Sequence, residues 1–145
     1  MKMTDLQIAT DNLRGHSICL CRDGVYFTDD GRGISPMMSF LEDKRELCGY
    51  SAADVIVGKA AAMLFVKAGI AEVYGEIMSA AARDYLARHG IPCSFGTLTP
   101  KIINRRGDGI CPMEQAVADI DDFEAGYLAL KKKISQLRVS SANSQ

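Results

Sequence analysis

The sequence predicts an α/β protein, a three-layer α-β-α sandwich in which helices cover both faces of a mixed sheet. Segments with the 3.6-residue apolar period of helices alternate with short runs rich in β-branched and aromatic residues. Strands joined through helices pack into such layers because each helix buries its apolar stripe against a sheet face. At 145 residues the chain is long enough for one hydrophobic core. We therefore expect one domain over residues 1–138 and a disordered tail over 139–145.

The first elements are a short helix and a hairpin. Thr4 can cap a helix that stops at Gly15, because its side-chain oxygen can accept a hydrogen bond from the first turn. The period then changes to that of two strands, 17–22 and 25–29. The Asp-Gly dipeptide between them supplies the positive φ angles that a tight hairpin turn needs.

A helix follows, with Ser35 as its N-cap, Pro36 in its first position and an end near Leu47. The next segment, 51–69, is apolar on all sides, which is typical of a helix buried among several elements. We expect this segment to be the central helix.

The ends of that central helix are marked in the sequence. Ser51 and Asp54 stand at a spacing similar to a capping box, and Gly69 suits the position after a helix end. A strand over 70–78 is predicted next. Ser79 then caps a helix that ends at Gly90, and one or two extended segments occupy 91–104.

The last predicted helix begins at Pro112 and continues to residue 137, a length of about 39 Å if it is unbroken. Gly126 could interrupt it. Its apolar residues form a narrow, heptad-like seam, which allows two interpretations. The helix either contacts another subunit, as in a homo-oligomer, or lies along its own sheet. The seam consists of Met113, Ala116, Ile120, Phe123, Tyr127, Leu130, Ile134 and Leu137.

The composition excludes several classes of protein. Seventeen Lys and Arg against 18 Asp and Glu give a net charge of −1, which argues against binding of long nucleic acids. Five cysteines, an odd number in apolar surroundings, indicate reduced thiols and a cytoplasmic location. The N-terminus has no apolar signal region, and no apolar run is long enough to cross a membrane. We expect a soluble protein that does not associate with membranes.

Metal and cofactor motifs are missing from the sequence. The two histidines, His16 and His89, lie in no recognisable ligand spacing, and there is no C-x-x-C pair. Walker, Rossmann and nucleophile-elbow motifs are also missing. We therefore predict no metal site and no cofactor.

The first candidate binding loop is DDGRGISP, residues 29–36. Its glycines allow backbone N–H groups to converge, Arg32 adds a fork of donors, and a helix N-terminus follows. The loop could hold a phosphate or carboxylate. It could also be a plain turn before a capped helix, and the plain turn is the commoner interpretation of such a pattern.

The second loop, NRRGDGICP, runs from Asn104 to Pro112 and places Cys111 at the N-cap of the last helix, near Arg105. The helix dipole and cations stabilise a thiolate there, so Cys111 could be a nucleophile with Glu114 as proton acceptor. The alternative is that Cys111 is a small buried hydrophobe and Glu114 bonds back to the helix cap.

Lys59 is the third candidate, because apolar residues surround it on the predicted central helix. It either reaches the protein edge or points into a pocket where it meets an anionic ligand. Asp54 is more consistent with a helix cap than with a partner of Lys59, although it could assist a ligand site.

Three segments resemble the prokaryotic family of domain of unknown function 1893, over most of residues 5–120. They are RGISPMMSFLE, ADVIVGKAAAMLFVKAGIAEVYGEIMS and NRRGDGICPMEQAV, with GKAAA and CPME as the most specific marks. The family looks like a divergent branch of the cytidine deaminase-like superfamily. The resemblance implies a mixed sheet between helices, with residues 58–60 and Cys111 near the two zinc-ligand motifs of deaminases.

The first zinc ligand, the acid/base glutamate and the second cysteine of the cysteine pair of those deaminases are not present at these positions. The resemblance therefore does not imply zinc-dependent deamination. It implies a pocket where the helices of Lys59 and Cys111 begin, suited to a small anionic molecule held by Arg32, Asp54, Lys59, Asn104 and Arg105. Three functions follow: an enzyme that uses Cys111 and Glu114, a non-catalytic metabolite-binding or regulatory oligomer, and residual nucleotide handling.

Overall fold

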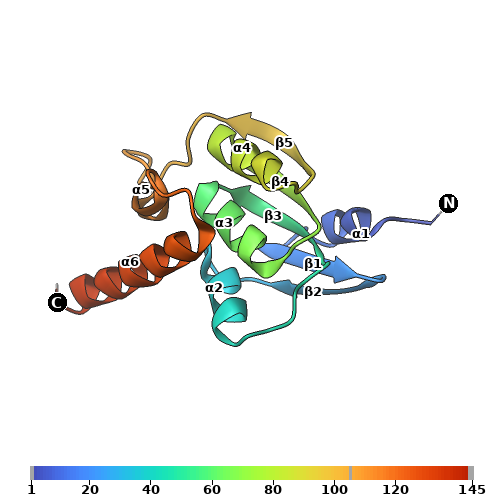
Figure 1. The fold of residues 1–145 in the computed structure, drawn as a ribbon, viewed down its shortest axis with the longest axis horizontal. Helices are drawn as coiled ribbons and strands as arrows, with labels where there is room; N and C mark the ends of the chain where they lie inside the picture. Colours follow the sequence, from blue (N-terminus) through green and yellow to red (C-terminus); the bar gives the residue numbers. More distant parts are fainter. Residues whose placement is uncertain (1, 105, 144–145) are drawn as a thin grey trace.

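The computed structural model describes residues 2–104 and 106–143 and contains a five-stranded sheet in the order β2-β1-β3-β4-β5 (Figure 1). Strand β1 is antiparallel to both of its neighbours, whereas β3, β4 and β5 are parallel. The predicted mixed sheet is therefore confirmed. The strands are β1 (Ile18–Arg22), β2 (Val25–Asp29), β3 (Ser51–Val57), β4 (Glu72–Ser79) and β5 (Cys93–Thr99).

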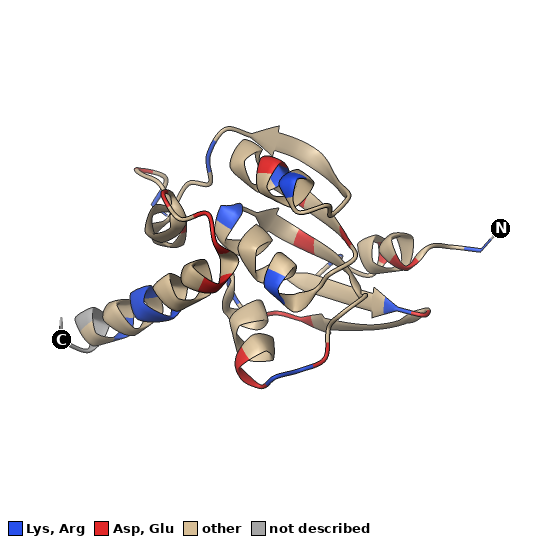
Figure 2. Ribbon diagram, viewed as in Figure 1, with Lys and Arg blue, Asp and Glu red and all other residues tan. Residues whose placement is uncertain are grey.

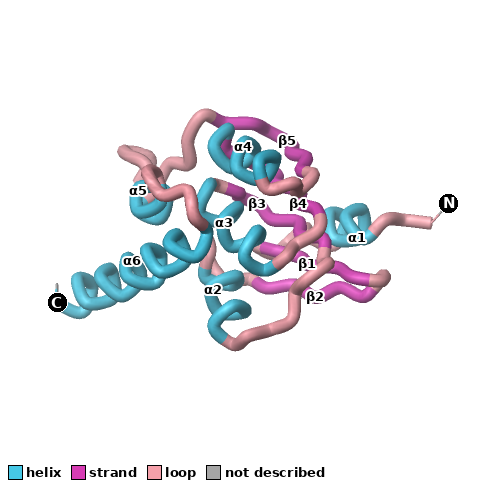
Figure 3. The backbone as a smooth tube through the Cα atoms, viewed as in Figure 1, coloured by secondary structure: helices cyan, strands magenta, loops and turns pink. Residues whose placement is uncertain are grey.

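Helices cover both faces of the sheet, which confirms the layered α/β prediction. Helix α1 lies alone on one side, where its Ala9, together with Leu13 just after the helix, packs against Cys19 and Cys21 of β1. The other helices form the thicker layer on the opposite side, with α3 at its centre (Figure 3). The helices are α1 (Asp5–Asp11), α2 (Ser35–Glu42), α3 (Lys59–Ala68), α4 (Ala80–Arg88), α5 (Pro112–Val117) and α6 (Phe123–Asn143).

The prediction of one helix over 51–69 is wrong. Residues 51–57 form β3, the middle strand of the sheet, and α3 begins only at Lys59. A continuous apolar run is compatible with a buried strand as well as with a buried helix, and three successive β-branched residues at 55–57 favour the strand. Ser51 and Asp54 consequently lie within a strand and cap no helix.

Several local signals act as predicted. Thr4 and Gln7 form a capping box at the start of α1, and Ser79 caps α4 by accepting a hydrogen bond from the Ala82 backbone N–H. Between β1 and β2, Asp23 and Gly24 have φ angles of 53° and 81°, as a tight hairpin turn requires.

Helix α2 differs from the prediction at both ends. Ile34 is its N-cap, Ser35 is already helical, and the helix ends at Glu42 rather than near Leu47. Leu47 instead lies in the following loop, where its side chain is buried in the core.

The C-terminal segment is two helices rather than one. The chain leaves the helical path over 118–122, before Gly126, and Asp122 then starts α6 by accepting a hydrogen bond from the Ala125 backbone N–H. Gly126 is inside α6, where a Cβ would lie 2.7 Å from the Met63 sulfur. The glycine therefore allows α6 to approach α3 closely.

The predicted apolar seam packs inward for much of its length. Leu130 is fully buried, and Phe123, Tyr127 and Ile134 contact the core. Helix α6 then continues to Asn143, into the segment for which a disordered tail is predicted.

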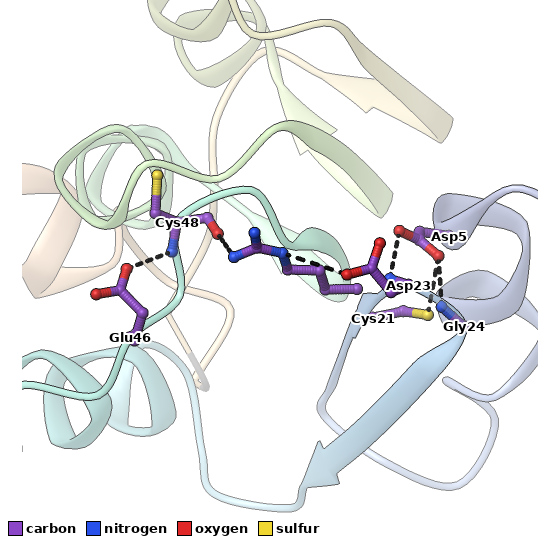
Figure 4. Close-up of polar contacts among 7 residues, drawn as sticks. Asp5, Cys21, Asp23, Gly24, Glu46 and Cys48 are labelled. Atoms are coloured by element: carbon purple, nitrogen blue, oxygen red, sulfur yellow. Dashed lines mark hydrogen bonds and ion pairs between the residues drawn. The ribbon is translucent and has the colours of Figure 1, made fainter.

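One side-chain cluster ties α1 and the loop after α2 to the hairpin (Figure 4). The Asp5 carboxylate accepts hydrogen bonds from both backbone N–H groups of the turn at Asp23–Gly24, and these bonds lower the pKa of Asp5. Arg22, just before the turn, donates to the Cys48 carbonyl at 2.7 Å. Among the described helices, none has the length and apolar character of a membrane span.

Candidate functional site

A pocket of about 870 Å³ opens between α2, the carboxyl end of β3, residues 102–104 and 106, α5 and residues 131–138 of α6. Its volume is in the range of known small-molecule sites. Its position is also typical, because ligands of open α/β sheets bind outside the carboxyl ends of parallel strands. Figure 1 shows how the two C-terminal helices and α2 lie around this end of β3.

Four basic side chains line the pocket from three different parts of the chain. Arg32 precedes α2, Arg106 belongs to the loop before α5, and Lys131 and Arg138 lie on α6. Figure 2 shows the basic residues of α6 as blue segments of that helix. In the part of the chain that the structure describes, none of the four forms an ion pair with a carboxylate. All four are exposed, and the Lys131 ammonium also lies 5.4 Å from the centroid of the Tyr127 ring.

The remaining surface of the pocket is mainly aliphatic. Ala60 and Ala61 of α3 are almost completely buried, and larger apolar side chains rise around them from the surrounding elements. No aromatic ring is found among the described residues of the lining. The larger aliphatic residues are Ile34, Met38, Ile56, Ile102, Ile103, Met113, Ile134 and Leu137.

Glu114 of α5 caps the N-terminus of α3. Its two carboxylate oxygens accept hydrogen bonds from the backbone N–H groups of Lys59 at 2.7 Å and Ala60 at 2.8 Å. Gly58 makes this possible, because a Cβ there would overlap the carboxylate. Burial raises the pKa of Glu114, and the two backbone hydrogen bonds partly offset that rise. The protein's own carboxylate thus occupies the positive end of α3.

A family model described as a domain of unknown function, DUF1893, matches residues 11–134. The chain belongs to the DUF1893 family. A crystal structure of a DUF1893 family protein from Thermotoga maritima is similar, with a TM-score of 0.73 and 21% sequence identity, and the match covers 94% of this chain and 97% of that chain. At this identity the similarity shows the fold. No curated protein matches the sequence.

A second solved structure from Thermotoga maritima is a diaminohydroxyphosphoribosylaminopyrimidine deaminase/5-amino-6-(5-phosphoribosylamino)uracil reductase. Its TM-score is 0.40 at 15% identity, with 61% of this chain and 31% of that chain covered. A TM-score this low does not establish a shared fold. DUF1893 membership is confirmed by the family model, whereas the link to the cytidine deaminase-like superfamily stays a prediction.

In the structure of this DUF1893 chain, four of the predicted site residues line the pocket, and Glu114 is one of them. The other three are Arg32, Asn104 and Cys111, whereas Arg105 lies outside the described residues. Cys111 is the N-cap of α5, as predicted, and is half-buried with a free thiol. Asn104 is held within its own loop by a hydrogen bond from its side-chain amide to Asp108.

Lys59 and Asp54 are not among the residues that line the pocket. The Lys59 ammonium donates to the Ala118 carbonyl at 3.2 Å and so closes the end of α5. Asp54 is 8% exposed in the middle of the sheet, where it accepts a hydrogen bond from the Ile56 backbone N–H at 3.4 Å. Burial raises the pKa of Asp54 to about 8.

The basic residues of α6 could not be assigned to a site from the sequence. Lys131 and Arg138 are seven positions apart and therefore share one helix face, which is the only signal they carry. What they face depends on the break over 118–122, beyond which α6 packs against α3 and α5.

Within the described residues of this DUF1893 chain, no three His, Cys, Asp or Glu side chains are grouped closely enough to hold a metal ion. Both histidines have other contacts. His16 bonds to Asp30 at 2.6 Å, and the His89 ring lies against the Tyr85 ring with 4.4 Å between centroids.

Proposed function

We propose that this DUF1893 domain binds a small anionic molecule in the pocket between α2, α5 and α6. The observation that carries the proposal is the convergence of Arg32, Arg106, Lys131 and Arg138 on one cavity, without a carboxylate partner among the described residues. Arginine guanidinium groups bind carboxylates and phosphates through paired hydrogen bonds, so the ligand would supply the missing negative charge.

The acidic residues of the lining support the same proposal. Glu114 already accepts hydrogen bonds from two backbone N–H groups of α3, and Glu42 is exposed at the end of α2. The four basic groups therefore outnumber the two carboxylates, one of which is directed at the protein itself. A pocket with this balance attracts anions.

Calorimetric titration with inorganic phosphate and with acetate tests the proposal. The double variant Arg32→Gln, Lys131→Gln is expected to bind either anion at least tenfold more weakly than the native chain, because two charge-assisted hydrogen bonds are lost. Lys132→Gln is the matched control, since Lys132 is exposed on α6 and is not part of the lining. Equal affinity in the double variant would refute the proposal.

An enzymatic form of this function would use Cys111 as a nucleophile, because its thiol lines the same pocket. Reaction with an alkylating probe across pH tests it, and a thiol pKa at or above the free value of about 8.5 would exclude the activated nucleophile. The hydrogen bonds of Glu114 favour a capping role, and its action as a proton acceptor stays a prediction. The non-catalytic alternative, a metabolite-binding or regulatory oligomer, needs the pocket but no reactive thiol.

A further inference from the structure

The interior and the rim of the pocket differ in chemistry. Its floor is the first turn of α3, where Ala60 and Ala61 are 1% and 4% exposed. Aliphatic side chains stand around this floor, among them Ile34 at the N-cap of α2, Met38 of α2 and Met113 of α5. Methionine side chains are flexible and adapt to ligands of irregular shape.

Helix α6 places two basic side chains at the exposed rim of the pocket. Lys131, Ile134 and Arg138 occupy positions i, i+3 and i+7, which lie on one helix face. The two basic residues are therefore about 10 Å apart along the helix, with Ile134 between them. Both basic side chains are exposed, whereas Ile134 is partly buried against the core.

The aliphatic lining also limits the kind of ligand. Proteins bind nucleobases by stacking them on aromatic or arginine planes and by hydrogen bonds to the base edges. The described lining residues contain no aromatic ring, and their arginines are at the exposed rim. An alkyl chain needs no such platform, because burial of its methylene groups is sufficient.

We propose that the ligand is an aliphatic anion, an alkyl chain that carries one carboxylate or phosphate group. The chain lies over Ala60 and Ala61 between α2 and α6, and the anionic group meets the basic side chains of the rim. This inference rests on the proposed anion-binding function and adds the chemical class of the ligand.

Calorimetric titration of the native chain with acetate, hexanoate, octanoate and octyl phosphate, all below their micelle concentrations, tests the class. Full burial of a methylene group strengthens binding by about fourfold, so we expect at least a twofold gain per methylene in this half-open pocket. Octanoate should bind at least tenfold more tightly than 1-octanol, which has the same chain without the charge. Adenosine monophosphate is the comparison ligand with an aromatic base.

Two variants on α6 locate the binding. Ser135 is exposed and lines the pocket, so Ser135→Phe would fill space that the alkyl chain needs. Octanoate affinity should fall at least tenfold, while acetate affinity stays within twofold of the native value. Gln136→Phe is the control, because this neighbouring exposed residue is not part of the lining. Circular dichroism confirms that both variants are folded.

The outcomes separate this inference from the function on which it rests. Anion binding without dependence on chain length, or tighter binding of adenosine monophosphate than of octanoate, would overturn the aliphatic ligand and leave the anion site intact. Equal affinity for octanoate and 1-octanol, or no binding of any anion, would overturn both. Binding to vesicles of anionic phospholipid without binding of any dispersed anion would also overturn both, in favour of a membrane surface.

Discussion

Replacement of Asp54 by Asn should stabilise the protein, and the gain should grow with pH. Asp54 is buried, and burial raises its pKa from 3.8 to about 8. Between these two values the folded state holds one proton that the unfolded state releases. The free energy of unfolding therefore falls by roughly 1.4 kcal/mol per pH unit, or about 3 kcal/mol from pH 5 to pH 7.

The sign follows from the direction of the shift. A raised folded-state pKa contributes stability that is complete below the unfolded value of 3.8 and is lost as the pH rises through about 8. Asparagine has no charge to bury and can still accept the hydrogen bond from the Ile56 backbone N–H. Asp54→Asn should therefore remove this part of the pH dependence.

Urea unfolding at pH 5, 6, 7 and 8 measures the effect for the native chain, Asp54→Asn and the exposed control Asp119→Asn. The difference in unfolding free energy between Asp54→Asn and the native chain should widen with each step, whereas Asp119→Asn should follow the native curve. Parallel curves for the native chain and Asp54→Asn would show that Asp54 is ionised in the folded protein, and the reasoning would be wrong.

Three further changes test the capping of α3 and α5 by chemical denaturation. Glu114→Ala should lower the free energy of unfolding by roughly 2–3 kcal/mol, because two backbone N–H groups lose a charged acceptor, and Glu42→Ala should change it little. Gly58→Ala should cost about 1–3 kcal/mol by displacing that carboxylate, and a cost that simply adds to that of Glu114→Ala would contradict a shared contact. Lys59→Met should cost roughly 1 kcal/mol through loss of the bond to the Ala118 carbonyl, and a stabilised variant would argue against that bond.

The parts of the fold that could be predicted depend on local interactions. The Thr4 and Ser79 caps and the Asp-Gly turn act within a few residues of themselves, so the sequence alone indicates them. The segment 51–69 is different, because its apolar residues are buried whether they form a strand or a helix. Pairing with β1 and β4 on either side makes residues 51–57 a strand, and that pairing is not visible in the segment itself.

The residues of the candidate site also divide into those with a local signal in the sequence and those that depend on contacts between distant segments. Arg32 and Cys111 are beside glycine or proline at helix starts, which is a local signal, and both line the pocket. The position of Glu114 just after Pro112 is a local signal as well, but its contact with α3 requires α3 and α5 to pack together. Lys131 and Arg138 join the pocket because α6 packs against α3 and α5, which depends on the break after α5.

The cap on α3 also has a consequence for how the chain folds. The acceptor that completes the start of this helix comes from Glu114, 55 residues farther along the chain than Lys59. Contacts between distant residues form late because a long loop must close first. The central helix therefore reaches its full stability only after α5 has docked, and this contact couples the C-terminal segment and the sheet into one cooperative folding unit.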